Sequence, residues 1–188
     1  MNASSLNAQE LMHLALYASE NDTPDKAIDH LKQLLKIEPD NGKALYLLGA
    51  LHAEIGMHDL AVEEMARALE LDAQLPDTAR FQLGLLHLTA GRIDDAEETW
   101  KGLEVLGTEH ALHLFKTGLL HMVRDEFQES AEALRAGIER NSFSEDLNND
   151  MRRVLRDVEN AAGSESSKPA DSGDSQRMLL SIYEKQEH

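Results

Sequence analysis

The chain has 188 residues, of which 41% are hydrophobic and only 4% aromatic, and it contains no cysteine. The absence of cysteine excludes disulfides, thiolate metal sites and a cysteine nucleophile. The 35 acidic and 18 basic residues give a net charge of −17 at pH 7. Because this charge repels nucleic acids and anionic membranes, we expect neither as a ligand.

The first residues, Met1–Ser5, contain neither a basic segment nor an apolar run. A secretory signal needs both, and a membrane-spanning helix needs about 20 mostly apolar residues. We therefore expect a cytoplasmic protein without a signal peptide or a transmembrane helix.

Three short segments of nearly the same sequence recur at spacings of 35 and 34 residues: Leu48–His52, Leu83–His87 and Thr117–His121. Each is followed by a small residue and then, four positions later, by a bulky one: Ala61 and Met65, Ala96 and Trp100, Ser130 and Leu134. A fainter copy precedes them, with Leu14 and Ala15 followed by Ala27 and Leu31. A period of this length predicts a solenoid of stacked helix pairs.

The pattern resembles the tetratricopeptide repeat (TPR) family, whose signature is a bulky residue, Leu-Gly, an aromatic, Ala-x3-Phe and a closing proline. Leu45–His52 matches the first half of this signature, Ala61 and Met65 match the second, and Pro39 closes the preceding copy. The resemblance implies an all-α TPR solenoid, a right-handed superhelix of antiparallel helix pairs. The repeats are expected at about 8–41, 42–76, 77–110 and 111–144.

Glycines and short polar residues are expected to reverse the chain inside each repeat. Gly56 and Gly91 fall where a first helix must end, and glycine adopts positive φ at little cost. Asn21-Asp22 and Asp125 occupy the equivalent places in the other two repeats. Asn and Asp also tolerate this conformation.

A different organisation is expected after the fourth repeat. Ser142–Glu145 has the pattern of a capping box that opens an amphipathic helix over 145–161, and this helix closes the solenoid. The TPR domain is thus assigned to 1–161. Residues 162–175 have the composition of a flexible linker, and 176–188 form a short amphipathic helix. Its apolar residues include Met178, Leu179, Ile182 and Tyr183.

The resemblance also implies a binding surface, because first helices of TPR units line a concave groove and known ligands lie along fixed positions of these helices. The corresponding residues here are mostly apolar: Met12, Leu16, Tyr46, Ala50, Phe81, Leu85, Leu88, Phe115, Leu119 and Met122. A groove of this kind suits an apolar or amphipathic segment. It lacks the Lys and Asn residues with which one TPR subclass binds a terminal carboxylate. The alternative is that the aromatic residues of this set are buried packing residues.

Histidine occupies the family's aromatic position in three repeats: His52, His87 and His121. Equivalent helices lie about 9 to 10 Å apart, so their side chains do not converge on one ion, and we expect packing residues. His110, His113 and Glu109 lie at a spacing that allows a shared ion, but no further ligand is identifiable. We expect no metal, no cofactor and, in the absence of any catalytic motif, no enzymatic activity.

The sequence therefore predicts a non-catalytic adaptor or scaffold that binds a protein segment in its groove. The C-terminal residues Met178–Tyr183 are a candidate ligand for an apolar TPR surface, in the same chain or in a second copy. Arg153 and Arg156 of the capping helix offer a cationic contact to an acidic group of the ligand. Two alternatives remain: a dedicated chaperone for a secreted or assembly-prone client, and a self-assembling regulatory subunit that dimerises through its tail.

Overall fold

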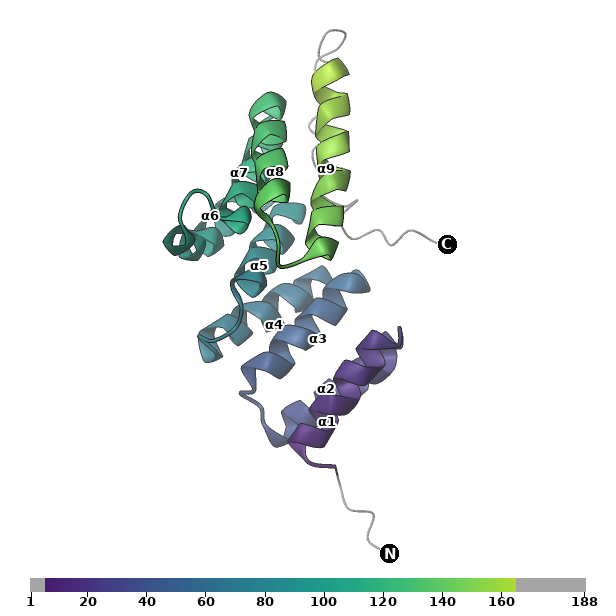
Figure 1. The fold of residues 1–188 in the computed structure, drawn as a ribbon. Coiled ribbons are helices and arrows are strands. Elements are labelled where there is room, and N and C mark those ends of the chain that lie inside the picture. Colours follow the sequence, from purple (N-terminus) through teal and green to yellow (C-terminus); the bar gives the residue numbers. More distant parts are fainter. Residues whose placement is uncertain (1–5, 165–188) are drawn as a thin grey trace, which may run out of the picture. The chain divides into compact units, whose positions relative to one another are not determined.

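The computed structural model describes residues 6–164, and this part of the chain consists of helices joined by short turns (Figure 1). Four helix pairs fall within the four predicted repeats. They are α1 (Ala8–Glu20) with α2 (Pro24–Ile37), α3 (Gly42–Glu54) with α4 (His58–Leu71), α5 (Asp77–Thr89) with α6 (Ile93–Trp100), and α7 (Ala111–Val123) with α8 (Phe127–Arg140). The predicted helical solenoid is confirmed.

Side-chain caps begin several of these helices. Asn7 and Glu10 form a reciprocal capping box, in which Asn7 Oδ1 accepts from the Glu10 amide at 3.0 Å and Glu10 Oε2 accepts from the Asn7 amide at 2.9 Å. Asn41 accepts from the Ala44 amide at 3.0 Å. These contacts satisfy backbone donors that a helix leaves unpaired at its N-terminus.

The predicted turns inside the repeats are confirmed by their backbone angles. Gly56 and Gly91 have φ of +79° and +72°, and Asp22 and Asp125 have φ of +52° and +61° at the equivalent positions of the other pairs. All four residues thus adopt the left-handed conformation that ends a helix and reverses the chain.

The two helices of a pair pack closely at the repeated glycine. A Cβ atom placed on Gly49 would lie 2.8 Å from Met65 Cγ, and one on Gly118 would lie 2.8 Å from Leu134 Cγ. On Gly84 it would lie 2.1 Å from Trp100 Nε1. The glycine is needed because the bulky residue of the second helix fills the space of its missing side chain.

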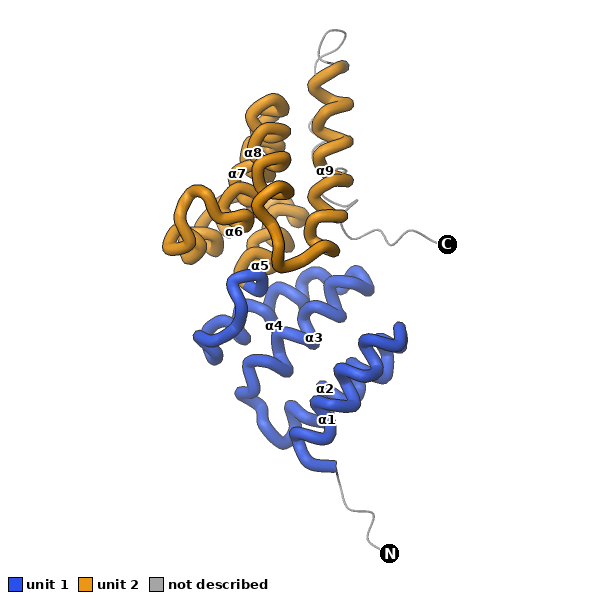
Figure 2. Tube along the Cα trace, viewed as in Figure 1, with its two compact units in different colours: residues 1–79 blue, residues 80–188 orange. Residues whose placement is uncertain are grey.

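The chain divides into two compact units, residues 1–79 and 80–188, with the boundary inside α5 (Figure 2). In unit 1, the core contains Leu11 and Ala15 of α1, Leu31 and Leu34 of α2, and Leu48 of α3. Each unit has its own hydrophobic cluster. The cluster of unit 2 draws on residues from Phe81 to Val158.

The third pair is irregular in a way that the repeat spacing does not predict. Its second helix, α6, ends at Trp100 and is followed by a 3-10 helix, η1 (Lys101–Leu106). Leu103 of η1 is fully buried in the core of unit 2, and Gly107 ends η1 with φ of +81°. The element η1 therefore replaces the last turns of a regular second helix.

The last described helix, α9 (Glu145–Ser164), begins at the predicted residue and packs against α8. The cap is Ser144 and not Ser142 as the predicted capping box requires, because Glu145 is the first residue of the helix and Ser144 Oγ accepts from the Leu147 amide at 3.2 Å. The helix extends three residues beyond the predicted end, so 162–164 are helical rather than part of a linker. The rest of the predicted linker and the predicted helix 176–188, with Met178, Leu179, Ile182 and Tyr183, lie outside the described residues.

Candidate functional site

Four of the predicted groove positions lie on α1 and α3 of unit 1 and are open to solvent to different extents. Leu16 is 40% exposed, and Met12, Tyr46 and Ala50 are partly buried. Met12 and Tyr46 occupy equivalent positions of their repeats, as do Leu16 and Ala50. We call these four residues the α1–α3 strip.

The six predicted groove positions of unit 2 are buried, with at most 3% of any side chain exposed: Phe81, Leu85, Leu88, Phe115, Leu119 and Met122. The prediction that they are exposed anchors is wrong, and the alternative of buried packing is correct for them. The rings of Phe81 and Trp100 stack with their centroids 5.7 Å apart. The ring centroids of Phe81 and Phe115 lie 6.3 Å apart. Trp100 Nε1 also donates to the Phe81 carbonyl at 3.0 Å.

Phe115 is buried because its ring packs closely against α8. A Cβ atom on Gly137 would lie 2.5 Å from the Phe115 ring, so the ring occupies the space above this glycine of α8. Large rings in unit 2 thus fill the interior between helices. The corresponding residues of unit 1, Met12 and Tyr46, are not packed in this way and stay partly accessible.

Exposed apolar side chains are concentrated in unit 1. Of the eleven large hydrophobic residues that are exposed within 6–164, only Val105 and Phe143 belong to unit 2. The nine in unit 1 are Leu6, Leu14, Leu16, Tyr17, Ile37, Ile55, Met57, Leu60 and Leu71. Of these nine residues, the sequence analysis predicted only Leu16 as a groove residue. The other eight lie outside the positions that line the groove in the TPR family.

A comparison between repeats of this chain would have revealed some of the missed residues. Ile55, Met57 and Leu60 surround the turn between α3 and α4. In the fourth repeat, the equivalent positions hold charged residues, Arg124, Glu126 and Glu129. The second repeat therefore has three apolar residues at a turn where the fourth repeat has charged ones.

Tyr46 is the polar group of the α1–α3 strip. Burial raises the pKa of its phenol, and a hydrogen bond with the Thr78 side chain opposes this shift. The phenol is therefore neutral at physiological pH, so the strip carries no charge of its own.

The three repeated histidines each have a different partner. His52 is buried and its Nδ1 lies 2.6 Å from Glu64 Oε2. His87 accepts from Arg92 Nε at 3.3 Å, and its pKa is lowered by burial and by the Arg92 charge. His121 contacts Glu126. Their side chains therefore join separate local contacts within their own repeats.

The group of Glu109, His110 and His113 is also divided among separate partners. Glu109 pairs with Arg140 at 2.7 Å. His110 Nδ1 accepts from the Leu112 amide at 3.2 Å, and its ring stacks on Phe143. Within residues 6–164, no three His, Asp or Glu side chains are placed to hold one metal ion.

The two arginines of α9 differ in their surroundings. Arg153 is partly buried and forms an ion pair with Asp150. Burial raises the Asp150 pKa and the arginine opposes that shift. Arg156 is exposed. Contact of either arginine with an acidic group of a ligand stays a prediction.

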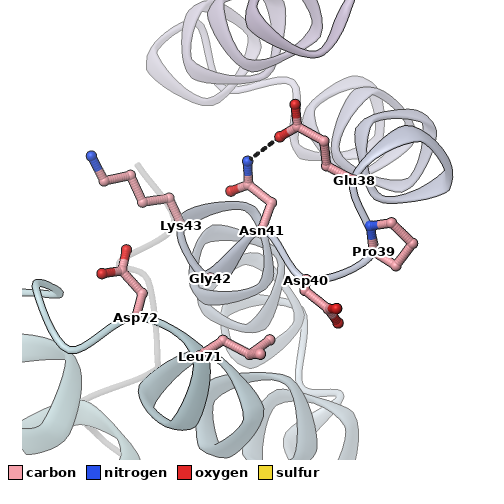
Figure 3. A pocket seen from close by; sticks show the side chains of 8 residues that line it. All are labelled: Glu38, Pro39, Asp40, Asn41, Gly42, Lys43, Leu71 and Asp72. Atoms are coloured by element: carbon pink, nitrogen blue, oxygen red, sulfur yellow. Dashed lines mark hydrogen bonds between the residues drawn. The ribbon is translucent and has the colours of Figure 1, made fainter.

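A surface cavity of about 520 Å³ lies in unit 1, beside the turn that joins α2 to α3 (Figure 3). It is lined by Glu38, Pro39, Asp40, Asn41, Gly42, Lys43, Leu71 and Asp72. Asn41 Nδ2 donates to Glu38 Oε2 at 2.7 Å, and Arg67 donates to Asp40 at 2.7 Å. The Asp72 carboxylate accepts from the Gln74 amide at 2.9 Å. These carboxylates thus stabilise the turns around the cavity.

Family models described as tetratricopeptide repeat match residues 18–82 and 81–145. This chain belongs to the TPR family. The matched residues cover both units, and the close glycine contacts of the repeats agree with this assignment. As a member of this family, the chain is a scaffold for protein–protein interaction.

The curated relatives of this TPR protein are much longer than it is. Protein CTR9 homolog from Arabidopsis thaliana is 26% identical over 118 residues, which are 60% of this chain and 10% of the relative. DnaJ homolog subfamily C member 3 from Bos taurus is 41% identical over 49 residues, 26% of this chain and 10% of the relative. The chain thus spans about a tenth of the length of these relatives.

Solved structures show the same fold. A MamA crystal structure has a TM-score of 0.61 at 19% identity and covers 93% of this TPR chain and 91% of its own. MamA 41-end from Desulfovibrio magneticus RS-1 has a TM-score of 0.64 at 14% identity, covering 96% and 97%. The structure of the APC/C hetero-tetramer Cut9-Hcn1 has a TM-score of 0.71 at 17% identity, and the match covers 93% of this chain and 33% of the matched chain. In the described part of this chain, no helix is long and apolar enough to cross a membrane.

Proposed function

We propose that this TPR protein is a non-catalytic scaffold that binds a segment of a partner protein along the α1–α3 strip. The observation that carries this proposal is that the groove positions of α1 and α3 stay accessible, with Leu16 40% exposed, in the unit that holds nine of the eleven exposed large apolar residues within 6–164. Soluble proteins rarely expose many large apolar residues in one region without a binding role. The equivalent groove positions of unit 2 are buried, which leaves unit 1 as the accessible part of the predicted groove.

The composition of the strip defines the chemistry of its ligand. Met12, Leu16 and Ala50 offer apolar contact, and Tyr46 adds one neutral hydroxyl. This set favours an amphipathic helix or an extended segment with apolar anchors at regular spacing. Because the chain has a net charge of −17, basic residues beside those anchors would raise the association rate.

Replacement of Leu16 by Glu tests this function directly. Leu16 is exposed, so Leu16→Glu should leave the helical far-UV circular dichroism unchanged. A carboxylate in the strip should lower affinity for an apolar segment at least about tenfold, as for a central anchor of an interface. The measurement compares the variant and the wild type in capture from native lysate, followed by titration of the captured partner.

Leu60→Glu is the matched control, since Leu60 is also 40% exposed but lies at the start of α4, outside the strip. It should bind like the wild type. Equal binding by both variants and the wild type would exclude the strip as the site. Capture of a single client at fixed stoichiometry would instead support the dedicated chaperone among the alternatives.

A further inference from the structure

One side of α3 packs into the core of unit 1. It consists of Ala44, Leu47, Leu48 and Leu51, which are spaced by three and four residues as on one face of a helix. Ala44, Leu48 and Leu51 are at most 6% exposed and belong to one cluster with residues of α1 and α2, and Leu47 packs against this cluster. The helix α2 packs against α3. These positions of α3 are therefore buried against neighbouring helices.

The equivalent side of α1 is open to solvent. Its residues are Glu10, His13, Leu14 and Tyr17, each 34 positions before its counterpart in α3. All four are exposed, and the exposed fractions of Leu14 and Tyr17 are 37% and 66%. We call these four residues the open α1 face. It has the spacing that packs against a helix in the next repeat, and its apolar pair is uncovered.

The charge of α1 specifies what can cover the open α1 face. Glu10 lies one turn before Leu14, and Glu20 lies one turn after Tyr17. The sequence of α1 contains no lysine or arginine. Glu10 accepts from the Asn7 amide through Oε2, so its other carboxylate oxygen can accept from a cation. A covering helix therefore gains two ion pairs if it carries Lys or Arg one turn before and one turn after its apolar residues.

A second copy of α1 does not meet this requirement. It would bring the same two glutamates and no lysine or arginine to the interface, and like charges across an interface oppose association. The net charge of −17 on each chain adds to this repulsion. The same field attracts a basic helix of another protein.

We propose that the open α1 face is a further docking site, which binds a basic amphipathic helix of a partner protein. The apolar side chains of that helix contact Leu14 and Tyr17. Its basic residues lie beside Glu10 and Glu20, which are about 15 Å apart along α1. Leu14 and Leu16 are two residues apart and so lie on nearly opposite sides of α1. This site is therefore separate from the α1–α3 strip.

Two designed peptides test the charge of the ligand. Each is an alanine-rich helix of about 20 residues with two leucines at a spacing of three. The lysine peptide carries a lysine one turn before and one turn after the leucines, and the glutamate peptide carries glutamates there. Each is titrated into the nitrogen-15-labelled full chain and followed by NMR. The lysine peptide should shift the amide signals of residues 10–20 and bind at least about tenfold more tightly, because only it forms both ion pairs.

Leu14→Glu separates docking from general attraction to an acidic protein. It makes the chain more negative, so general attraction would leave binding of the lysine peptide equal or tighter. Docking lowers the affinity at least about tenfold, as for a central interface anchor. Tyr17→Ala leaves the charge unchanged and should also weaken binding. Leu16→Glu is the matched control, since it adds the same charge on another side of α1 and should bind like the wild type.

Three results would overturn the proposal: no binding of the lysine peptide, equal affinity for both peptides, or binding that Leu14→Glu and Tyr17→Ala leave unchanged. Ultracentrifugation of the chain alone provides a fourth test. Dimerisation that Leu14→Glu abolishes would show that a second copy covers this face instead. Since Leu16→Glu tests the α1–α3 strip and Leu14→Glu tests the open α1 face, failure at one site is distinguishable from failure at the other.

Discussion

At the scale of single residues, Gly84 is the position where the repeat tolerates least change. A Cβ atom at this position would lie 2.1 Å from Trp100 Nε1, and Trp100 is itself held by its hydrogen bond to the Phe81 carbonyl. We expect Gly84→Ala to lower the free energy of unfolding by about 1 to 3 kcal/mol, the usual cost of overpacking a core. Urea unfolding followed by circular dichroism measures this change.

Gly163 of α9 is the control, because no atom lies within 4 Å of a Cβ placed there. Alanine has a higher helix propensity, so Gly163→Ala should stabilise the chain by up to about 1 kcal/mol. Equal effects of the two substitutions would show that Trp100 moves aside at little cost and that the glycine is not required for packing.

Burial explains which residue predictions succeeded. The sequence predicted the repeated glycine, the repeated small residue and the repeated bulky residue. Close packing of two helices restricts residue size at these positions in every repeat, so the restriction appears as a sequence pattern. Exposure of Phe81 and Phe115 was predicted wrongly, since it depends on which distant side chains fill the space beside them. Trp100 and Leu103 fill that space in unit 2. The equivalent residues Met12 and Tyr46 of unit 1 remain partly accessible.

At the scale of elements, η1 is fixed by an ion pair to α7. The Lys116 ammonium is largely buried, with 8% of its side chain exposed, and it donates to Glu104 of η1. This hydrogen bond holds the Glu104 pKa below its usual range. Since the folded-state pKa is the lower one, the pair stabilises the fold above the unfolded-state pKa. Its contribution is lost as the pH falls through the folded-state pKa.

Removal of this carboxylate should loosen η1. In Glu104→Gln at neutral pH, the buried Lys116 ammonium loses its charged partner, so amide hydrogen exchange in η1 should accelerate while α8 stays protected. Glu98→Gln removes the partner of Lys101 in an exposed pair and should change nothing. Unchanged exchange in Glu104→Gln would mean that Leu103 alone holds η1.

The helices and the element η1 differ in how much local sequence determines them. Apolar periodicity and turn residues such as Gly56 and Asp125 predicted four helix pairs and a terminal helix, because these signals act within a few residues. The end of α6 at Trp100 was not predicted. A Cβ on Gly102 would lie 2.6 Å from Arg80 Cδ. The path of η1 thus depends on a contact with α5, about twenty residues earlier in the chain.

At the scale of the whole molecule, the repeat period predicted the solenoid but not the boundary between residues 79 and 80. The sequence period specifies how one helix pair follows the next. The boundary between compact units depends instead on how many contacts each helix pair makes with its neighbours. The net charge of −17 is the other global property. It acts on all described repeats because acidic residues are spread along the chain.

The large negative net charge predicts how the stability of the fold depends on salt concentration. Compaction brings like charges together and costs free energy, and added salt screens this repulsion. Salt also screens the ion pairs, but most of those in residues 6–164 are exposed and each contributes about 1 kcal/mol or less. We therefore expect Tm to rise when NaCl increases from about 0.05 to about 0.5 M, over which the Debye length falls from roughly 14 to 4 Å.

Thermal unfolding by circular dichroism measures this shift, and it should be the same in NaCl and KCl, because screening depends on ionic strength and not on the cation. A fall in Tm would show that specific pairs such as Lys116 with Glu104 outweigh the general repulsion. The Glu104→Gln variant separates these contributions. If that pair dominates, its loss removes the fall; if repulsion dominates, wild type and variant gain the same increase in Tm.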